Sequence, residues 1–381
     1  MNKYFRISLW VFIFCPLLVR TQVHVRLVAA QLPAGHGSDT LYAAGNFNIW
    51  KTHDDKYKFA VNNNGERILE LNVPAGKYEF KITRGDWSRM ETTAEGKNLG
   101  NRAFVVTEDT TIKLVIAGWS DDFKKGSFIR KHTASPNVTI MDSAFAMPQL
   151  NRTRRITLYL PKDYYTNTKK KFAVLYMHDG QNLFDEATSG FGEWGIDECL
   201  DSLFMQGVKE CIVVGIDNGP KRMNEYNPYN FTSFGNGEGN GYVDFIVSTL
   251  KPFIDSHLRT LSGKKNTFIA GSSMGALISM YAVLKYPGTF GGAGIFSPSF
   301  WVAPALEKDV KTAATKVNSR LFFYAGGNES EKMVPDMKKI ETGIKSASRS
   351  KIYEAVDPQA KHNEAAWRKY FPVFYKYVIG N

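Results

Sequence analysis

Two patterns of hydrophobic and polar residues divide the chain. Residues 22 to about 120 hold short runs rich in alternating or β-branched residues, with turn signals such as NNNGE and PAG between them. In KYEFKIT, Tyr78, Phe80 and Ile82 alternate with polar residues, which predicts a strand with one face on a core. Several such strands in one segment indicate a small all-β, immunoglobulin-like sandwich.

From about residue 154 the pattern changes to buried strands that alternate with helices. FAVLYMHD and CIVVGIDNG are nearly continuous apolar runs, typical of strands buried on both faces. Residues with helical spacing follow each run, for example MGALISMYAVLKYP. The alternation predicts an α/β fold, with a mostly parallel sheet and helices on both faces.

The first 21 residues have the pattern of a secretory signal. Lys3 and Arg6 precede an apolar run at 7–19, which is too short to span a membrane. We expect cleavage near Thr21–Gln22 and an exported protein, periplasmic or secreted, with no membrane association afterwards. A membrane anchor is the alternative interpretation.

Charge and cysteine content narrow the function. The net charge is +11, and loss of Lys3, Arg6 and Arg20 with the signal lowers it to +8. The basic residues are scattered, so nucleic-acid binding is not predicted. The remaining cysteines, Cys199 and Cys211, form no C-x-x-C motif and no histidines cluster, so we expect neither a metal site nor a cofactor. The two cysteines are expected to form a disulfide or to stay free thiols.

The segment FIAGSSMGALISM holds the pattern G-x-S-x-G at 271–275, between a predicted strand and a predicted helix. A sharp strand-to-helix turn needs small residues beside its central serine and exposes that hydroxyl at a helix N-terminus. Ser273 is therefore the candidate nucleophile, and Ser272 is expected to pack or to form a local hydrogen bond. A purely structural glycine turn is the alternative.

A serine nucleophile needs a base, which is oriented by an acid. In α/β-hydrolases these follow in the order Ser, acid, His, and His362 is the one histidine after Ser273. Glu329 comes soonest after the strand RLFFYAGG and is the favoured acid, with Glu331 and Asp336 as alternatives.

The oxyanion of an acyl transfer needs preorganised N–H donors. We expect one from the amide of Met274, directly after the nucleophile. The other is expected from the amide of Gln181 in the loop HDGQNLF, where Gly180 permits a tight turn.

From about Arg154 onward the chain resembles the putative-esterase family of α/β-hydrolases. This family includes esterase-D-like enzymes, ferric enterobactin esterases, and feruloyl and acetyl-xylan esterases. The resemblance lies in LYMHDGQNLFD, VGIDNGPKRMNEYNP, AGSSMGA, FSPSFW, YAGGNES and HNEAAW. It implies Ser273 as nucleophile, His362 as base, an acid at the position of Glu329, and an oxyanion hole at Gln181 and Met274. Many members carry aspartate as the acid, so glutamate is a departure that also occurs in the family.

Other residues near these segments are candidates for substrate binding. They are Arg222, Glu225, Tyr226, Trp194 and Trp301. An arginine beside an acid at this edge of a sheet serves either substrate binding or an ion pair that braces the loop.

The N-terminal segment resembles the early-set sandwich of starch-binding modules, through LYAAGNFNIW and the strand and loop after YEFKIT. The resemblance implies that Trp50 and Trp87 stack on sugar rings and that Asn101 bonds a hydroxyl. The alternative is that these residues pack the sandwich. Ferric siderophore esterases also carry such a domain.

The sequence thus predicts an exported serine esterase, acting on acyl or feruloyl esters of a carbohydrate. A ferric siderophore trilactone esterase is the first alternative, and a carbohydrate-binding protein with an inactive hydrolase domain is the second. The predicted bounds are 1–21 for the signal, 22–120 for the sandwich, 121–153 for a connector and first strand, and 154–381 for the hydrolase domain.

Overall fold

The computed structural model describes residues 22–123, 131–231 and 235–380. The predicted signal at 1–21 lies outside the described residues. The chain divides into two compact units, Met1–Lys124 and Lys125–Asn381, and each is considered by itself. Within the described ranges, no helix is both long and apolar enough to cross a membrane.

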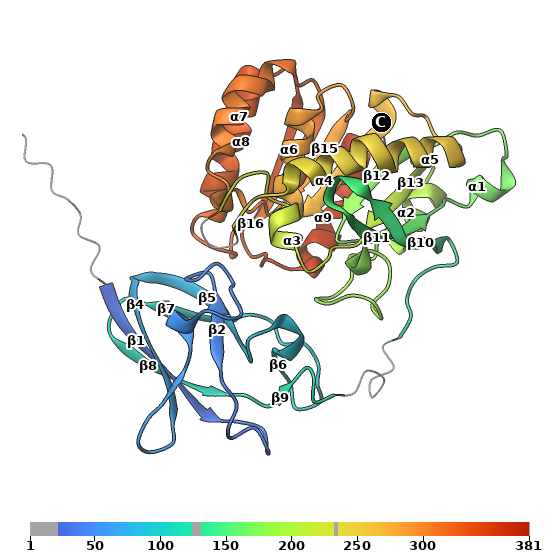
Figure 1. The fold of residues 1–381 in the computed structure, drawn as a ribbon. Helices are drawn as coiled ribbons and strands as arrows, with labels where there is room; N and C mark the ends of the chain where they lie inside the picture. Colours follow the sequence, from blue (N-terminus) through green and yellow to red (C-terminus); the bar gives the residue numbers. More distant parts are fainter. Residues whose placement is uncertain (1–21, 124–130, 232–234, 381) are drawn as a thin grey trace, which may run out of the picture. The chain divides into compact units, whose positions relative to one another are not determined.

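The N-terminal unit is all-β (Figure 1). Its strands are β1 (Gln22–Gln31), β2 (Tyr42–Gly45), β3 (Ala60–Val61), β4 (Arg67–Pro74), β5 (Gly76–Thr83), β6 (Glu91–Thr92), β7 (Arg102–Val106), β8 (Thr110–Val115) and β9 (Gly118–Trp119). Two sheets, in the orders β3-β4-β1-β8 and β2-β5-β7, contribute to one core, and β6 pairs with β9. Leu69 and Leu71 of one sheet and Phe80 and Ile82 of the other are buried in that core. The predicted sandwich is confirmed.

Strand β5 differs in one respect from its sequence pattern. The alternation predicts that Lys81 and Thr83 face away from the core, yet both are buried. The Lys81 ammonium donates to Asn98 Oδ1 at 3.0 Å and to the Leu99 carbonyl, so a loop covers the second face of the strand. Burial lowers the pKa of Lys81.

The second unit is built on one sheet in the order β10-β11-β13-β12-β14-β15-β16-β17. Its strands are β10 (Val138–Met147), β11 (Arg152–Tyr159), β12 (Ala173–His178), β13 (Cys211–Ile216), β14 (Thr267–Ser272), β15 (Gly292–Phe296), β16 (Arg320–Gly326) and β17 (Lys351–Asp357). The pairs β10–β11 and β11–β13 are antiparallel, and the other pairs are parallel. Strand β10 falls within 121–153, the segment expected to hold the connector and first strand.

Helices cover both faces of this sheet (Figure 1). They are α1 (Asp163–Thr166), α2 (Ile196–Met205), α3 (Arg222–Glu225), α4 (Gly239–Phe245), α5 (Lys251–His257), α6 (Met274–Lys285), α7 (Leu306–Ala313), α8 (Met333–Ala347) and α9 (Glu364–Val378). Val174 and Tyr176 of β12 share a core with α4 to α8, whereas Leu175 and Met177 share one with α2 and α9. This alternation is that of a strand buried on both faces, so the predicted α/β fold is confirmed.

The two cysteines of the described residues are free thiols. Cys199 lies in α2 and Cys211 begins β13. Burial raises the pKa of Cys199 to about 11 and that of Cys211 to about 12, so both stay protonated at neutral pH. Of the two sequence-based alternatives, the structure contains the free thiols.

Candidate active site

Ser273 occupies a strained turn between β14 and α6. Its φ of 58° and ψ of −119° are rare for a residue with a side chain. The glycine two residues before Ser273 has no room for a side chain. A Cβ on Gly271 would lie 2.9 Å from His178 Cδ2 and 2.9 Å from the carbonyl carbon of Gly275. Ser273 is partly exposed, whereas the neighbouring Ser272 is buried, as the sequence predicts.

A second serine lies against the candidate nucleophile. Ser299 follows β15, and its Oγ lies 3.0 Å from Ser273 Oγ. The amide of Ser299 also donates to the carbonyl oxygen of Ser273 at 3.1 Å. Ser299 belongs to the segment FSPSFW, but the sequence of that segment predicts no role for it. The contact itself depends on the loop geometry, which no local pattern reveals.

His362 and Glu329 are joined by a hydrogen bond. His362 lies between β17 and α9, and its Nδ1 is 2.7 Å from Glu329 Oε2. Glu329 follows β16 and is almost fully buried, with 1% of its side chain exposed. Glu331 is exposed, and Asp336 lies in α8. Of the three carboxylates considered, the structure thus joins Glu329 to the histidine.

The predicted oxyanion donors lie at the starts of two helical turns. Met274 is the first residue of α6, where backbone amides have no partner within the helix. Gln181 lies in a single 3₁₀ turn, Gly180–Asn182, which follows Asp179 at a φ of 57°. A Cβ on Gly180 would lie 2.8 Å from Asp217 Oδ1, so this turn also requires a glycine. The donor role of both amides stays a prediction.

An ion pair braces the turn that carries Gln181. Arg222 donates to both carboxylate oxygens of Asp179, at 2.7 and 2.8 Å, and Asn218 donates to Oδ1 at 2.6 Å. Burial would raise the pKa of Asp179, but the charge and hydrogen bonds of Arg222 outweigh it and lower the pKa. The neighbouring His178 is buried without a charge partner of this kind, and burial lowers its pKa to about 3. His178 is therefore neutral at physiological pH.

The structure corrects three of the predicted substrate-binding residues. Glu225 is fully buried and pairs with Arg152 at 2.6 Å and with Arg154. Tyr226 is fully buried, and Trp194 is 3% exposed in the core under α9. Side chains buried in this way are not accessible to a substrate, because packing against their neighbours covers them.

Arg222 and Trp301 remain accessible. Arg222 keeps 26% of its side chain exposed while it pairs with Asp179. Its guanidinium carbon also lies over the Tyr226 ring, 5.0 Å from the ring centroid. Trp301 is half-buried in the turn Phe300–Val302. The structure therefore contains the bracing ion pair at Arg222 and leaves substrate contact by these two residues as a prediction.

A buried carboxyl near the base was not found from the sequence. Glu364 begins α9 two residues after His362, and it is 6% exposed. Burial raises its pKa to about 7, although the charges of His362 and Arg222 act in the opposite direction. A glutamate in the first turn of a helix is common, so the segment HNEAAW carries no signal of this environment.

The sandwich brings its two candidate tryptophans side by side. The ring centroids of Trp50 and Trp87 are 6.4 Å apart with 34° between the planes, and 38% of Trp87 is exposed. Trp50 has a φ of 59°. Asn101 is exposed, and its amide donates to Glu79 Oε2 at 3.2 Å. The accessible pair is compatible with the predicted sugar contact.

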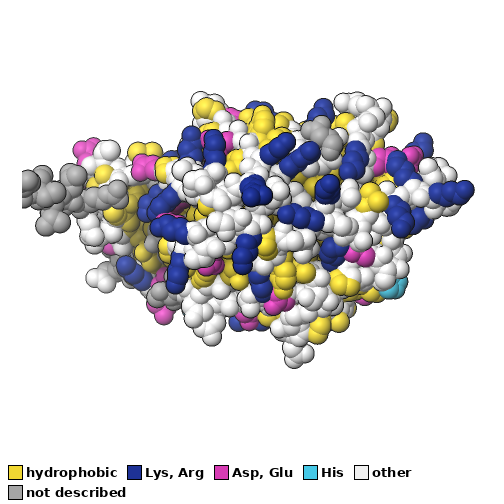
Figure 2. Space-filling view, turned by 90° about the horizontal axis from the view of Figure 1, so that it is seen from above, with side chains coloured by type: hydrophobic (Ala, Val, Ile, Leu, Met, Phe, Trp, Pro, Cys, Tyr) yellow, Lys and Arg dark blue, Asp and Glu magenta, His cyan; other side chains and the backbone are white. Residues whose placement is uncertain are grey.

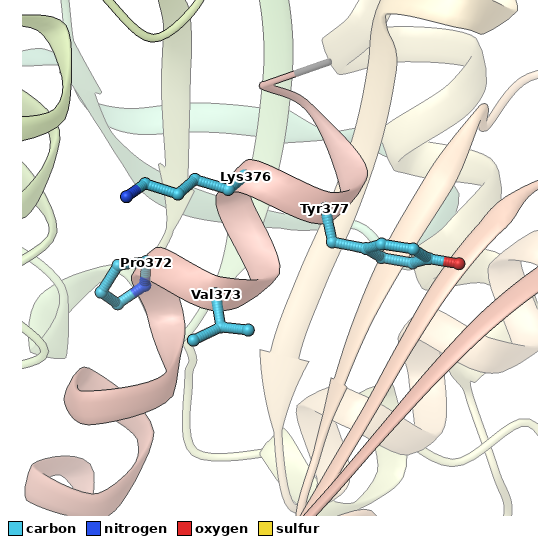
Figure 3. Close-up of a pocket in the computed structure, with 4 residues that line it drawn as sticks. All are labelled: Pro372, Val373, Lys376 and Tyr377. Carbon is cyan, nitrogen blue, oxygen red and sulfur yellow. The ribbon is translucent and has the colours of Figure 1, made fainter. Parts of the chain in front are cut away.

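A cavity of about 350 Å³ lies on α9 (Figure 3). Pro372, Val373, Lys376 and Tyr377 line it. Pro372 lies eight residues beyond Glu364, roughly 12 Å along the helix. None of the predicted site residues lines this cavity.

The match to a family model agrees with this arrangement. The model described as "Putative esterase" matches residues 147–375, more than half of the chain. The uncharacterised protein YbbA of Bacillus subtilis (strain 168) is 29% identical over 57% of this chain and 89% of its own length. The endo-1,4-beta-xylanase/feruloyl esterase of Xylanibacter ruminicola is 24% identical over 60% of this chain, but the match spans 30% of that protein.

A solved structure extends the similarity of fold to most of the chain. The enterobactin esterase FES from Shigella flexneri, determined in the presence of enterobactin, has a TM-score of 0.52 to this protein. The two are 14% identical, and the alignment covers 93% of each chain. At this identity the likeness concerns the fold, while the family match concerns the enzyme class. The chain therefore belongs to the Putative esterase family of carboxylic ester hydrolases.

Proposed function

We propose that the protein is a serine esterase with the triad Ser273, His362 and Glu329. The observation that carries the proposal is the Glu329–His362 hydrogen bond at the same sheet edge as the strained elbow of Ser273. A serine hydroxyl becomes a good nucleophile only when a base takes its proton. Because Glu329 holds Nδ1 of His362, Nε2 is the nitrogen that takes this proton.

The proposed reaction has two steps. Ser273 Oγ attacks the ester carbonyl carbon while His362 takes the hydroxyl proton, and His362 then gives that proton to the departing alkoxide. Water, deprotonated by His362, attacks the acyl-enzyme. The bond from the acyl carbon to Ser273 Oγ then breaks, His362 returns its proton to Oγ, and the carboxylic acid is released. In both steps the amides of Met274 and Gln181 bind the oxyanion, and one such donor typically contributes on the order of 3 kcal/mol to the barrier reduction.

We propose a carbohydrate ester, with an acyl or feruloyl group, as the substrate, and an exported enzyme. The accessible Trp50–Trp87 pair supports a sugar partner, because aromatic faces stack on sugar rings. The electrostatics near the triad support a neutral substrate. Arg222 is already paired with Asp179, and Glu364 adds a buried carboxyl nearby. The apolar run at 7–19 supports export.

A ferric siderophore trilactone is the competing substrate, because the fold likeness to FES includes both units of this chain. An anionic catecholate would favour a pocket with several unpaired cations. Figure 2 shows Lys and Arg side chains spread over one face among hydrophobic and neutral polar residues, rather than gathered in one patch. At the candidate site, the pairing of Arg222 with Asp179 favours the carbohydrate ester.

A substrate panel tests the proposed function. Residues 22–381 would be assayed with p-nitrophenyl acetate, a feruloylated or acetylated xylo-oligosaccharide, and a ferric trilactone siderophore. We expect release of the acid from the oligosaccharide, and loss of that release in Ser273→Ala. Release from the siderophore alone would reject the carbohydrate ester. No serine-dependent release from any of the three would reject the triad and favour a binding protein.

The sandwich is expected to bind polysaccharide through Trp50 and Trp87. Replacing either with alanine should weaken retention on xylan or starch about tenfold, or about 1.4 kcal/mol, because half of the stacking surface is lost. Hydrolysis of p-nitrophenyl acetate should not change. Affinity electrophoresis measures the retention, with Tyr165→Ala as a control for an exposed aromatic residue of the other unit. Equal retention in all variants would show that the pair packs the sandwich.

A further inference from the structure

We propose that Trp367 and Ser297 form a relay that holds Glu329 where it orients His362. The relay rests on the triad proposed above and adds two positioning residues to it. Ser297 lies directly after β15, and Trp367 lies in the first turns of α9. The proposal thus assigns a positioning function to two side chains that take no part in the bond changes themselves.

Glu329 is held from both sides by hydrogen bonds. Its Oε1 accepts from Ser297 Oγ at 2.6 Å and from the Gly326 amide at 2.6 Å, while its Oε2 contacts His362 Nδ1 at 2.7 Å. Trp367 Nε1 donates to Ser297 Oγ at 2.9 Å. A chain of hydrogen bonds therefore runs from the indole to the imidazole, and every protein group in it is buried except His362.

The direction of each hydrogen bond in this chain is determined by chemistry. An indole N–H only donates, and an ionised carboxylate only accepts. Ser297 has one hydroxyl proton, so it must accept from Trp367 and donate to Glu329. This single arrangement fixes the orientation of the Ser297 hydroxyl. The hydrogen bonds in a buried chain of this kind also polarise and strengthen one another. Without Trp367 Nε1–H, the hydroxyl of Ser297 could turn away from the carboxylate.

Two further observations concern the geometry of Ser297 and Trp367. Ser297 has a φ of 45°, a left-handed conformation that glycine adopts without strain, so the structure retains a side chain at a cost. Trp367 also packs edge-on against the His362 ring, with centroids 5.1 Å apart and an interplanar angle of 88°. The indole therefore constrains the base directly and the acid through Ser297.

The test is a double-mutant cycle. Ser297→Gly removes the hydroxyl and suits the left-handed backbone, and Trp367→Phe removes the N–H while it keeps an aromatic ring. With p-nitrophenyl acetate, we expect kcat/KM to fall about 10- to 100-fold in Ser297→Gly and about 3- to 10-fold in Trp367→Phe. The double variant should be no slower than Ser297→Gly, because the N–H acts through the hydroxyl.

A spectroscopic readout separates positioning from packing. The Nδ1 proton of His362, observed by NMR at low temperature, should shift in both single variants, since its partner carboxylate is less well held. Ser319→Ala is the matched control, because it removes a buried hydroxyl that donates to the Phe290 carbonyl at 2.8 Å, away from Glu329. The control should leave the rate and the proton shift unchanged.

Several results of these kinetic and NMR measurements would contradict the relay or separate its failure from that of the triad. Single-variant effects that multiply in the double variant, or a Ser297→Gly rate within twofold of wild type, would assign both residues to packing alone. If Ser297→Gly failed to fold, an unchanged rate and NMR shift in Trp367→Phe would reject the relay. Failure of the triad itself is distinguishable, because hydrolysis would then persist in Ser273→Ala.

Discussion

Replacing Ser273 with alanine is expected to lower kcat for ester hydrolysis about 10⁵- to 10⁶-fold, the scale typical of a lost triad nucleophile. We do not expect the neighbouring hydroxyl of Ser299 to take its place. Ser299 Oγ lies 3.0 Å away but follows a different strand, β15, and is buried. The variant keeps the Cβ and gives up one hydrogen bond, so Tm should change little. Stopped assays with a chromogenic ester, at high enzyme concentration, measure the residual rate.

The adjacent serine supplies the control for that experiment. Ser272→Ala removes a hydroxyl one residue away that is buried in β14. It should retain kcat within a few-fold of wild type. A Ser273→Ala enzyme that kept a tenth of the activity, or a Ser272→Ala enzyme that lost it, would contradict the assignment of the nucleophile.

Replacing Glu329 with glutamine is expected to lower kcat about 10³- to 10⁴-fold, through the tautomer of His362. Ser297 Oγ and the Gly326 amide both donate to Oε1, so the glutamine must place its oxygen there. Its amide group then faces Nδ1 of His362 and donates to it. Nδ1 becomes the acceptor, the proton moves to Nε2, and the base can no longer accept a proton from Ser273.

The two rejected carboxylates give matched controls for Glu329→Gln. Glu331 is exposed and Asp336 lies in α8, so Glu331→Gln and Asp336→Asn should leave kcat unchanged. Steady-state kinetics for all three variants, with Tm as a check on folding, identify the carboxylate that orients His362. A silent Glu329→Gln beside an inactive Glu331→Gln would transfer the role to the exposed residue.

The elements of the fold with strong local signals could be predicted from the sequence. The elbow at Ser273 is predicted by a strand, two glycines and a helix, and in the structure the first of these glycines, Gly271, has no room for a Cβ. Burial of whole side chains could not be predicted in the same way. Tyr226 and Glu225 follow a strand at the catalytic edge, as substrate contacts would, yet packing and two arginines cover them.

Hydrogen bonds between residues far apart in the sequence were a second feature of the structure that could not be predicted. Ser297 and Trp367 are 70 positions apart, and Ser299 and Ser273 are 26 apart. Serine occurs in many loops, and nothing adjacent to these serines marks them as partners. His362 was predictable for a different reason. The order of the triad along the chain left it as the one histidine after Ser273.

The sheet order has a consequence for thermal inactivation. Ser273, the proposed nucleophile, follows β14 in the interior of the sheet, whereas His362, the proposed base, follows β17, the last strand in the order. An edge strand has ladder bonds on one side, and opening of such units generally takes less free energy than global unfolding. On heating, we therefore expect activity to be lost before the far-UV circular dichroism changes, because His362 would detach while the turn at Ser273 stays folded.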